Sequence, residues 1–382
     1  MTVRQHSIDK MTDWMPNAAS SYQSSRNYDL DGKQTTSRLS ESISAGILSE
    51  MDVIDCAKRF NISMKNNKFI EEIFWRVYFR GYFETHPSVW KYYTKNLNSH
   101  FQKLPKYYDI AVRGETEIEC FNVWINQLKE TGYLHNHTRM WFASIWIFTL
   151  DLPWELGADL FMRYLNDADE ASNTLSWRWV AGLHTSKKPY VARASNIFKY
   201  TQKYNPQNKL NPSPEPIREA IDHAFKPLEL DQTLPYSASL VMFDNFLDIK
   251  QLNLEDCALE NFYVFEHSQE TSRNIDREKA RVRSEIVAEI SNKINLKPQF
   301  FNEQSIDGLF GQSLVTSYIF SGYFKDQISP LLNQIERNSN TTYLLRNLDS
   351  LSWNFCKGGY FKLKTKIQEI TADLFEPQLF AS

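Results

Sequence analysis

The chain has 382 residues, more than one ordinary hydrophobic core supports, so its length predicts two domains. Hydrophobic residues make up 42% of it and charged residues 23%, as in globular proteins. Its most apolar run, residues 140–150, is too short to cross a bilayer, and its N-terminal segment lacks the apolar core of a signal peptide. The composition therefore excludes a membrane-spanning chain and predicts a cytoplasmic protein.

Charge and aromatic content divide the chain near residue 210. Residues 1–210 hold nine of the ten tryptophans and 26 basic against 22 acidic side chains, while residues 211–382 hold 17 basic against 24 acidic. A mildly basic first part is compatible with a polyanionic partner but does not establish one. The four cysteines form no C-x-x-C pair, which favours buried free thiols over a metal site.

The predicted elements change in kind along the chain. Up to residue 205 the apolar positions recur at helical spacing, most clearly over 67–84, which should end before Pro87, and over 132–150. Residues 199–216 contain four prolines and are typical of a linker. We therefore predict a helical domain over 1–205, a linker over 206–235 and a third region over 236–382.

Short apolar runs alternate with amphipathic segments in this third region. Strands are expected at 237–244, 260–267, 298–301 and 341–345, and helices at 277–294, 321–338 and 360–375. Such alternation predicts a smaller, Rossmann-like α/β domain with a parallel sheet. The region contains neither a G-x-G-x-x-G motif nor a P-loop, so it lacks the standard nucleotide signatures.

Two helical segments carry side chains suited to a polar aromatic ligand. Glu72, Trp75 and Arg76 share one helical face, which could equally be an amphipathic surface with one ion pair. Asn136 has the donor and acceptor needed to read a base edge, or it could cap the helix that follows. His135 and His137 point to different sides of a helix, which argues against a paired metal site.

Two further segments contain charged or hydroxyl side chains. We expect Asp167 or Asp169 to pair with an arginine rather than to bind a metal, because further ligands at suitable spacing are missing. Residues 35–40, TTSRLS, combine hydroxyls with an arginine at a helix start, which forms either an anion site or an ordinary cap.

Five motifs occur in order before residue 200. They are SRLS (37–40), FWRVYFRGYFETHP (74–87), TGYLHNHTRMWFAS (131–144), DLPWELG (151–157) and YLNDADEASNTLSWRWVAG (164–182). Together they resemble the FAD-binding domain of the photolyase and cryptochrome family over about residues 22–200. The resemblance implies an all-helical FAD-binding domain and a flavoprotein that absorbs blue light.

The resemblance also implies roles for individual residues. The positions matching those that bind the phosphates and ribose of FAD, or line its isoalloxazine ring, are Tyr22, Thr36, Ser37, Arg38, Leu39, Ser40, Arg76, Arg139, Asp167, Asp169 and Asn173. Those matching the pocket for a flipped cyclobutane pyrimidine dimer are Glu72, Trp75, Asn136, Met140 and Trp179. Trp177 and Trp154 match the first two members of a tryptophan chain that photoreduces the flavin.

The sequence departs from the family pattern at several places. His137 stands where an arginine is usual, and Leu175-Ser176 replaces a glycine pair. No tryptophan is expected for the surface member of the chain between His86 and Gly114, where Phe101, Tyr107 or Tyr108 could substitute. Family members carry an α/β antenna domain before the FAD domain. Here strands 237–244 and 260–267 resemble the start of that domain displaced to the C-terminus, which indicates a circular permutation with an unidentified antenna chromophore.

The resemblance supports two functional interpretations, besides a flavoprotein that kept the fold after losing both roles. The first is a DNA repair enzyme, a deoxyribodipyrimidine photolyase (a carbon–carbon lyase) that uses reduced FAD to split cyclobutane pyrimidine dimers in DNA. The residues at 136 and 140 favour it over a (6-4) photolyase, which would have histidines there. The second is a cryptochrome-like blue-light sensor without repair activity, whose protein partner would be unknown, and His137 and the acidic C-terminal part favour it.

Overall fold

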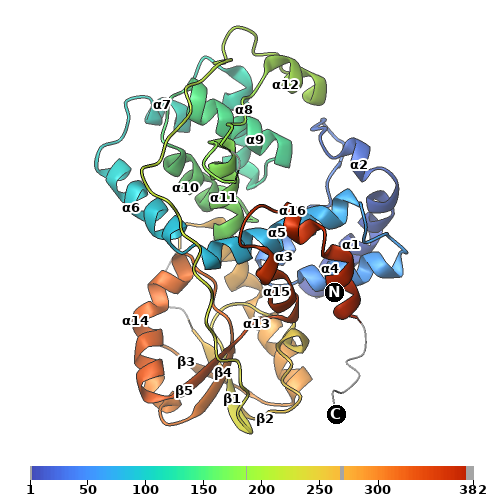
Figure 1. Ribbon diagram of the computed structural model, residues 1–382, viewed down its shortest axis with the longest axis vertical. Helices are drawn as coiled ribbons and strands as arrows, with labels where there is room; N and C mark the ends of the chain where they lie inside the picture. Colours follow the sequence, from blue (N-terminus) through green and yellow to red (C-terminus); the bar gives the residue numbers. More distant parts are fainter. Residues whose placement is uncertain (1, 186, 267–270, 376–382) are drawn as a thin grey trace.

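The computed structural model describes residues 2–185, 187–266 and 271–375 (Figure 1). Helices make up its N-terminal part. They are α1 (Val3–Ser20), α2 (Tyr22–Ser25), α3 (Ser40–Ser44), α4 (Glu50–Arg59), α5 (Lys68–Thr85), α6 (Ser88–Gln102), α7 (Tyr108–Arg113), α8 (Glu119–Thr131), α9 (Asn136–Ser144), α10 (Trp154–Tyr164), α11 (Glu170–Val180) and α12 (Ala194–Thr201). The predicted helix at 67–84 is α5. The side chain of Asn67 caps its N-terminus, and it ends two residues before Pro87, as predicted.

The helix predicted over 132–150 starts later than expected. Gly132 adopts a left-handed φ of 66° and ends α8 instead, a conformation that glycine accepts without strain. Helix α9 then begins at Asn136 and continues into a π-helical segment, Ile145–Thr149. Its cap is His135, whose Nδ1 accepts a hydrogen bond from the His137 N–H, so the alternative that Asn136 caps this helix is wrong.

The C-terminal region contains a five-stranded sheet whose strand pairs are all parallel, as predicted. The strands are β1 (Ser237–Met242), β2 (Ala258–Phe265), β3 (Pro298–Phe301), β4 (Ser313–Ser317) and β5 (Asn340–Leu344), in the order β3-β2-β1-β4-β5. The sequence prediction missed β4, a short SLVTS run with serine at both ends. The strand predicted to reach residue 267 ends at Phe265, and residue 267 itself lies outside the described residues.

Two long helices cover opposite faces of this sheet. Leu240 of β1 belongs to the same hydrophobic core as Val282 of α13 (Asn274–Ile294). The next residue, Val241, belongs to a separate core with Ile328 of α14 (Tyr323–Asn338). This division follows from the two-residue period of a strand, which sends successive side chains to opposite faces.

The chain returns to the helical part after β5. Helices α15 (Asn347–Ser352), α16 (Phe361–Lys364) and α17 (Ile367–Asp373) lie beside α4 and α5 (Figure 1). Their buried side chains, including Leu348 and Leu363, share one hydrophobic core with Phe74 and Val77 of α5. The C-terminal segment that we assigned to the α/β region therefore packs on the helical region, and the helix predicted over 360–375 is two short helices.

Residues 202–236 connect the two regions without forming a helix or strand. This extended segment is held by specific contacts, the strongest being an ion pair in which Arg178 donates to both carboxylate oxygens of Glu219 at 2.5 and 2.7 Å. The Lys226 N–H also donates to the carbonyl of Thr85 at the end of α5. The connecting segment is therefore bound to the helical region at Glu219 and Lys226.

The cysteine prediction is confirmed, because all four thiols are free and buried. Burial raises the pKa of Cys120 to about 12, which keeps this thiol protonated and unreactive. No helix within the described ranges is long and apolar enough to cross a membrane.

The close packing of the C-terminal segment on α5 depends on Gly81. A Cβ atom at this position would lie 2.6 Å from the Trp353 ring and 2.9 Å from the Cys356 sulfur. We expect Gly81→Ala to lower the free energy of unfolding by about 1–3 kcal/mol through overpacking. Urea denaturation measures this change. Gly308→Ala is the matched control, since its Cβ would meet nothing within 4 Å; equal stability of the two variants would contradict the packing described.

Candidate functional site

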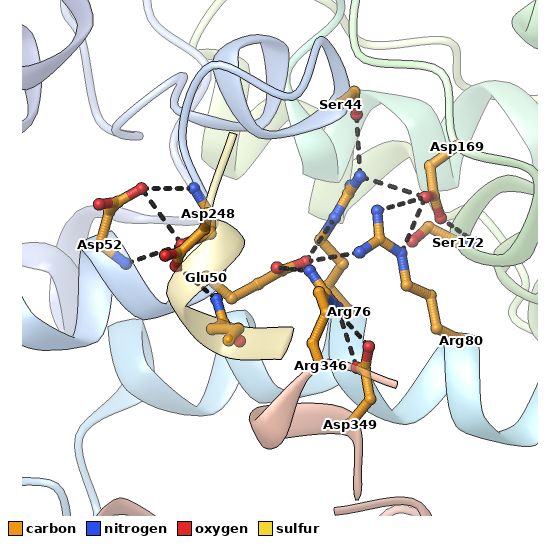
Figure 2. Close-up of polar contacts among 12 residues, drawn as sticks. Ser44, Glu50, Asp52, Arg76, Arg80, Asp169, Ser172, Asp248, Arg346 and Asp349 are labelled. Atoms are coloured by element: carbon orange, nitrogen blue, oxygen red, sulfur yellow. Dashed lines mark hydrogen bonds and ion pairs between the residues drawn. The ribbon is translucent and has the colours of Figure 1, made fainter. Parts of the chain in front are cut away.

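A buried network of charged side chains lies where the helical and sheet regions meet (Figure 2). Its centre is Glu50, the first residue of α4, which is completely buried. One carboxylate oxygen of Glu50 accepts hydrogen bonds from Arg76 and Arg80 of α5, each at 3.1 Å, and the other accepts from Arg346 at 2.7 Å. Arg346 also pairs with the buried Asp349 of α15 at 2.6 and 2.9 Å.

Asp169 completes this network on the side of α11. Its side chain caps α11 by accepting from the Ser172 N–H, and it also accepts from Arg76 at 3.1 Å and Arg80 at 3.2 Å. Burial alone would raise the pKa of both Glu50 and Asp169, but the adjacent guanidinium groups outweigh burial and hold both pKa values well below their usual range. Both carboxylates are therefore ionised at neutral pH.

A second pair extends the network toward α9. Arg139 donates to Asp167 at 3.0 Å, and the Ser40 hydroxyl donates to the same carboxylate at 2.7 Å. The Ser44 hydroxyl donates to the Asp167 carbonyl at 2.9 Å and accepts from Arg76 at 3.0 Å. The structure thus joins Ser40, Arg76, Arg139, Asp167 and Asp169 in one network. Both aspartates pair with an arginine, where the sequence predicted such a pair for one of them.

The hydroxyl-rich segment 35–40 lies against Tyr133. The Thr36 hydroxyl lies 3.1 Å from the Tyr133 hydroxyl, and the Arg38 guanidinium is 3.9 Å from the centre of the Tyr133 ring. Arg38 has a left-handed φ of 54°, and its Nε is buried with no hydrogen-bond partner among the residues described. Ser37 and Leu39 flank it, with Leu39 buried at the start of α3. An unpaired buried N–H beside hydroxyls is suited to an anionic ligand.

Glu72 and Trp75 lie on α5. Glu72 keeps 41% of its side chain exposed and lies 3.9 Å from Arg26. The Trp75 ring is half-buried and stacks on Tyr360 with a centroid separation of 3.8 Å and an interplanar angle of 16°. Tyr22, the first residue of α2, is buried with its ring edge against Phe69 of α5.

Asn136 and Met140 lie one turn apart on α9, exposed and half-buried respectively. His137 is buried on another side of this helix, where it stacks on Trp141 and lies 3.3 Å from the Tyr190 hydroxyl. Burial lowers the pKa of His137, so it is neutral at neutral pH. Tyr190 in turn stacks on Trp179 with centroids 5.6 Å apart. His137 is therefore part of the wall behind Trp179 rather than a fixed cation.

Trp177 is buried on the opposite side of α11, with its ring edge-on to Phe161 at 5.1 Å. Its indole N–H is buried without a partner in the described part of the chain. Gly157 of α10 makes room for it, because a Cβ there would lie 2.3 Å from the ring. Asn173, one turn earlier on α11, is oriented by a 2.9 Å hydrogen bond from its Nδ2 to the carbonyl of Ala158.

The aromatic neighbour of Trp154 differs from those the sequence offered. The Trp154 ring lies 5.5 Å from Tyr93, and Tyr93 lies 5.2 Å from Trp90 on α6. Tyr107 and Phe101 are largely exposed elsewhere, and Tyr108 contacts Trp146. Trp90 lies between His86 and Gly114, so the prediction that this interval contains no tryptophan is wrong.

Sequence reasoning missed four charged members of the network, Glu50, Arg80, Arg346 and Asp349. Arg80 follows Arg76 by one helical turn, so the spacing alone could have shown that both share a face. Glu50 lies in the first turn of α4 and resembles an ordinary helix-start acid. Arg346 lies 296 residues from its partner Glu50, and no local pattern indicates that contact.

A cavity of about 120 Å³ lies on the sheet side of the network. Its lining comes from the segments after β1 (residues 244–248) and β4 (residues 317–322), together with Glu50, Arg80 and Asp169. In the sheet, β1 and β4 are neighbours. Strands β2 and β3 follow on the side of β1, whereas β5 follows on the side of β4, so the strand order reverses between β1 and β4. Open α/β sheets form their ligand crevice at such a point.

The comparisons with known proteins agree with this geometry. Residues 69–210 match the FAD-binding domain of DNA photolyase. The chain is 31% identical over 191 residues to a deoxyribodipyrimidine photo-lyase of Agrobacterium fabrum, covering 48% of this chain and 39% of that protein. It is 30% identical over 174 residues to the photo-lyase of Salmonella typhimurium, covering 42% and 36%.

A cryptochrome DASH of Idiomarina loihiensis is 27% identical over 199 residues, covering 50% of this chain and 43% of that protein. The match assigns an FAD-binding type of helical domain to residues 69–210. Over this part the chain is similar to proteins of the photolyase and cryptochrome family. It spans less than half the length of these curated relatives.

Replacing Glu50 by glutamine tests the network directly. Removing the only charge shared by three buried guanidinium groups should lower the free energy of unfolding at pH 7 by about 3–5 kcal/mol. Because the folded pKa of Glu50 is depressed, its charge stabilises the fold above the unfolded pKa and this contribution is lost as the pH falls. In urea denaturation the gap between parent and Glu50→Gln should therefore narrow from pH 7 toward pH 3.

The exposed ion pair of Asp55 with Arg59 provides the control for this measurement. Asp55→Asn should change stability by less than about 1 kcal/mol, since solvent screens such pairs. If Glu50→Gln lowers the free energy of unfolding no more than Asp55→Asn does, the buried network stabilises the fold no more than an exposed ion pair.

Proposed function

We propose that the protein is a light-driven DNA repair enzyme, a photolyase that splits cyclobutane pyrimidine dimers with reduced FAD. One observation carries this proposal: Ser40, Arg76, Arg139, Asp167 and Asp169 are joined in one buried network around the part of the chain that matches the FAD-binding domain of DNA photolyase. The named activity of the relatives supports the reaction class.

The residues around segment 36–40 fit the phosphates of FAD. The unpaired Nε of Arg38 and the hydroxyls of Thr36 and Ser37 supply donors, and Arg139 extends positive charge along the same wall. Arg76 and Asp169 would hold that wall in place, and Asn173 would face the flavin ring. Reduced FAD, when bound, supplies the electron that opens the dimer, and Trp177 and Trp154 would supply electrons to the cofactor.

The substrate would bind against the half-exposed side chains of α5, α9 and α11. Glu72 and Asn136 offer an acceptor and a donor–acceptor pair for pyrimidine edges, Trp75 and Trp179 offer indole faces, and Met140 offers apolar contact. Taking a damaged base out of the duplex costs a few kcal/mol, and stacking on an aromatic ring returns about 1–3 kcal/mol per base. The protein's part is to hold the lesion beside the cofactor.

A cryptochrome-like sensor is the second candidate function. The neutral, buried state of His137 favours it, because the position offers no fixed positive charge for a DNA phosphate. Relatives named cryptochrome DASH also match the same stretch of the chain. Such a protein would change its oligomeric state or bind a partner in light without removing dimers.

We also propose a refined division into domains. Residues 1–205 and the returning helices α15–α17 would form the FAD-binding domain, residues 206–235 the linker, and residues 236–346 a Rossmann-like α/β domain. Its parallel sheet and the cavity beyond β1 and β4 support its interpretation as a displaced antenna-type domain. The antenna chromophore is unidentified.

Arg38→Ala tests the cofactor assignment. Loss of a charge-assisted contact to a phosphate should weaken FAD binding by about tenfold or more. Fluorescence titration of the flavin-free protein with FAD measures this affinity, with thermal unfolding as a check on the fold. Arg59→Ala, an exposed arginine of α4, should bind FAD as the parent does. Undiminished affinity of Arg38→Ala would remove Arg38 from the cofactor site.

The repair reaction itself is tested with ultraviolet-treated DNA. The flavin-loaded parent should remove dimers in blue light but not in darkness, and Glu72→Ala should lower that rate by about tenfold or more while leaving the flavin absorbance intact. Glu130→Ala, exposed on α8, is the matched control. Absence of light-dependent dimer loss in the parent would exclude the photolyase, and a light-dependent change in oligomeric state would then favour the sensor.

A further inference from the structure

We propose that residues 357–366, KGGYFKLKTK, form a contact surface for the DNA strand that flanks the lesion. The proposal rests on the proposed repair function, because that function places DNA beside Trp75. This segment lies outside the stretch that matches the FAD-binding domain and outside the family motifs of the sequence. The matched stretch and the family motifs therefore assign no role to this segment.

The segment is positioned at the edge of the candidate lesion site. Tyr360 stacks on Trp75, and its hydroxyl donates to the carbonyl of Glu71 at 2.8 Å. The Tyr78 hydroxyl donates to the carbonyl of Gly358 at 2.7 Å and lies 3.1 Å from Nε2 of His184. Since His184 follows α11, the segment lies between the helix that carries Trp75 and the loop that follows Trp179.

The side chains that point away from the core have the chemistry of a single-strand binding surface. Phe361 is 75% exposed, although the neighbouring Tyr360 and Leu363 are buried. Lys357 and Lys362 are exposed on either side of it and form no ion pair with the residues described. An exposed ring between cations matches the combination of base stacking and phosphate contact by which proteins hold single strands.

The backbone of the segment leaves room for a nucleic acid to approach. A Cβ atom added to Gly358 or Gly359 would meet nothing within 4 Å, so these glycines border open space and are not required for packing. Two other lysines are already paired within the protein, Lys364 with Glu71 and Lys366 with Glu369. Lys362 and Lys357, whose Nζ lies 5.1 Å from the centre of the Phe225 ring, thus remain as lysines without an ion pair among the described residues.

The balance of these features favours DNA over a protein partner. Of the acidic groups near the segment, Glu71 and Glu369 pair with lysines, and Glu72, whose charge also acts on Tyr360, lies 3.9 Å from Arg26. Lys357 and Lys362 therefore add positive charge around the Phe361 ring. A protein interface of the same size would present an apolar cluster, whereas here Phe361 is flanked by lysines.

The experiment measures binding of a fluorescent single-stranded oligothymidylate without lesions, by anisotropy, at several salt concentrations. The flavin-loaded parent should bind it with an affinity that falls as salt rises. Phe361→Ala should weaken binding by about tenfold through the loss of base stacking. Lys357→Ala and Lys362→Ala should each reduce the slope of log affinity against log salt by about 0.7.

Matched controls lie on the edge strand of the sheet. Phe300 of β3 is 55% exposed, and Lys297, the residue before the start of β3, is also exposed, so Phe300→Ala and Lys297→Ala remove the same side-chain types elsewhere. These variants should bind the oligonucleotide as the parent does. If the parent fails to bind, or if the Phe361 and lysine variants bind no more weakly than the controls, the surface is misassigned.

The experiment tests the contact surface separately from the proposed repair function. A parent that binds the oligonucleotide through Phe361 but splits no dimers would keep the surface and exclude the enzyme. A parent that repairs dimers while its Phe361 and lysine variants bind and repair normally would keep the enzyme and exclude the surface.

Discussion

A single buried carboxylate, that of Glu50, is shared by the guanidinium groups of Arg76, Arg80 and Arg346, and the arrangement of the helices around it depends on this sharing. Removing ions from water costs several kcal/mol each unless they are paired and hydrogen-bonded. Here the three cations are balanced by Glu50, Asp169 and Asp349, so the cluster is neutral as a whole. Its geometry sets where α4, α5, α11 and α15 meet.

The same cluster borders both candidate ligand sites. Arg76 and Asp169 connect through Ser44 to the Arg139 and Asp167 pair, which belongs to the candidate cofactor wall. Glu50 and Arg80 also line the cavity on the sheet side of the network. A ligand in that cavity would therefore contact Glu50 and Arg80, which in turn bind Arg76 and Asp169 beside the candidate cofactor site. The two candidate ligand sites are separated by one layer of ion pairs, not by a thick hydrophobic core.

Much of the fold could be predicted because local patterns determine it. Neighbouring residues determine the helical period of α5, its cap at Asn67 and its end before Pro87. The same holds for the alternation of strands with helices after residue 236. The short strand β4 was missed because five residues carry little periodicity. The start of α9 was misplaced because Gly132 belongs to the end of the preceding helix.

The site was predictable only where side chains share a motif. The pairing of Asp167 and Asp169 with arginines followed from the cost of burying lone charges. The contacts of Glu50 with Arg346 and of Trp75 with Tyr360 join residues nearly 300 positions apart, and no spacing rule reaches that far. They arise because the chain returns to the helical region after the sheet.

That return gives the molecule two crossings between its regions, the extended stretch 202–236 and the short step from β5 to α15. A body attached at two points cannot swing open about one flexible joint, and Glu219 secures the longer crossing near its middle. A rotation of one region relative to the other is thereby restricted to an axis through these two crossings.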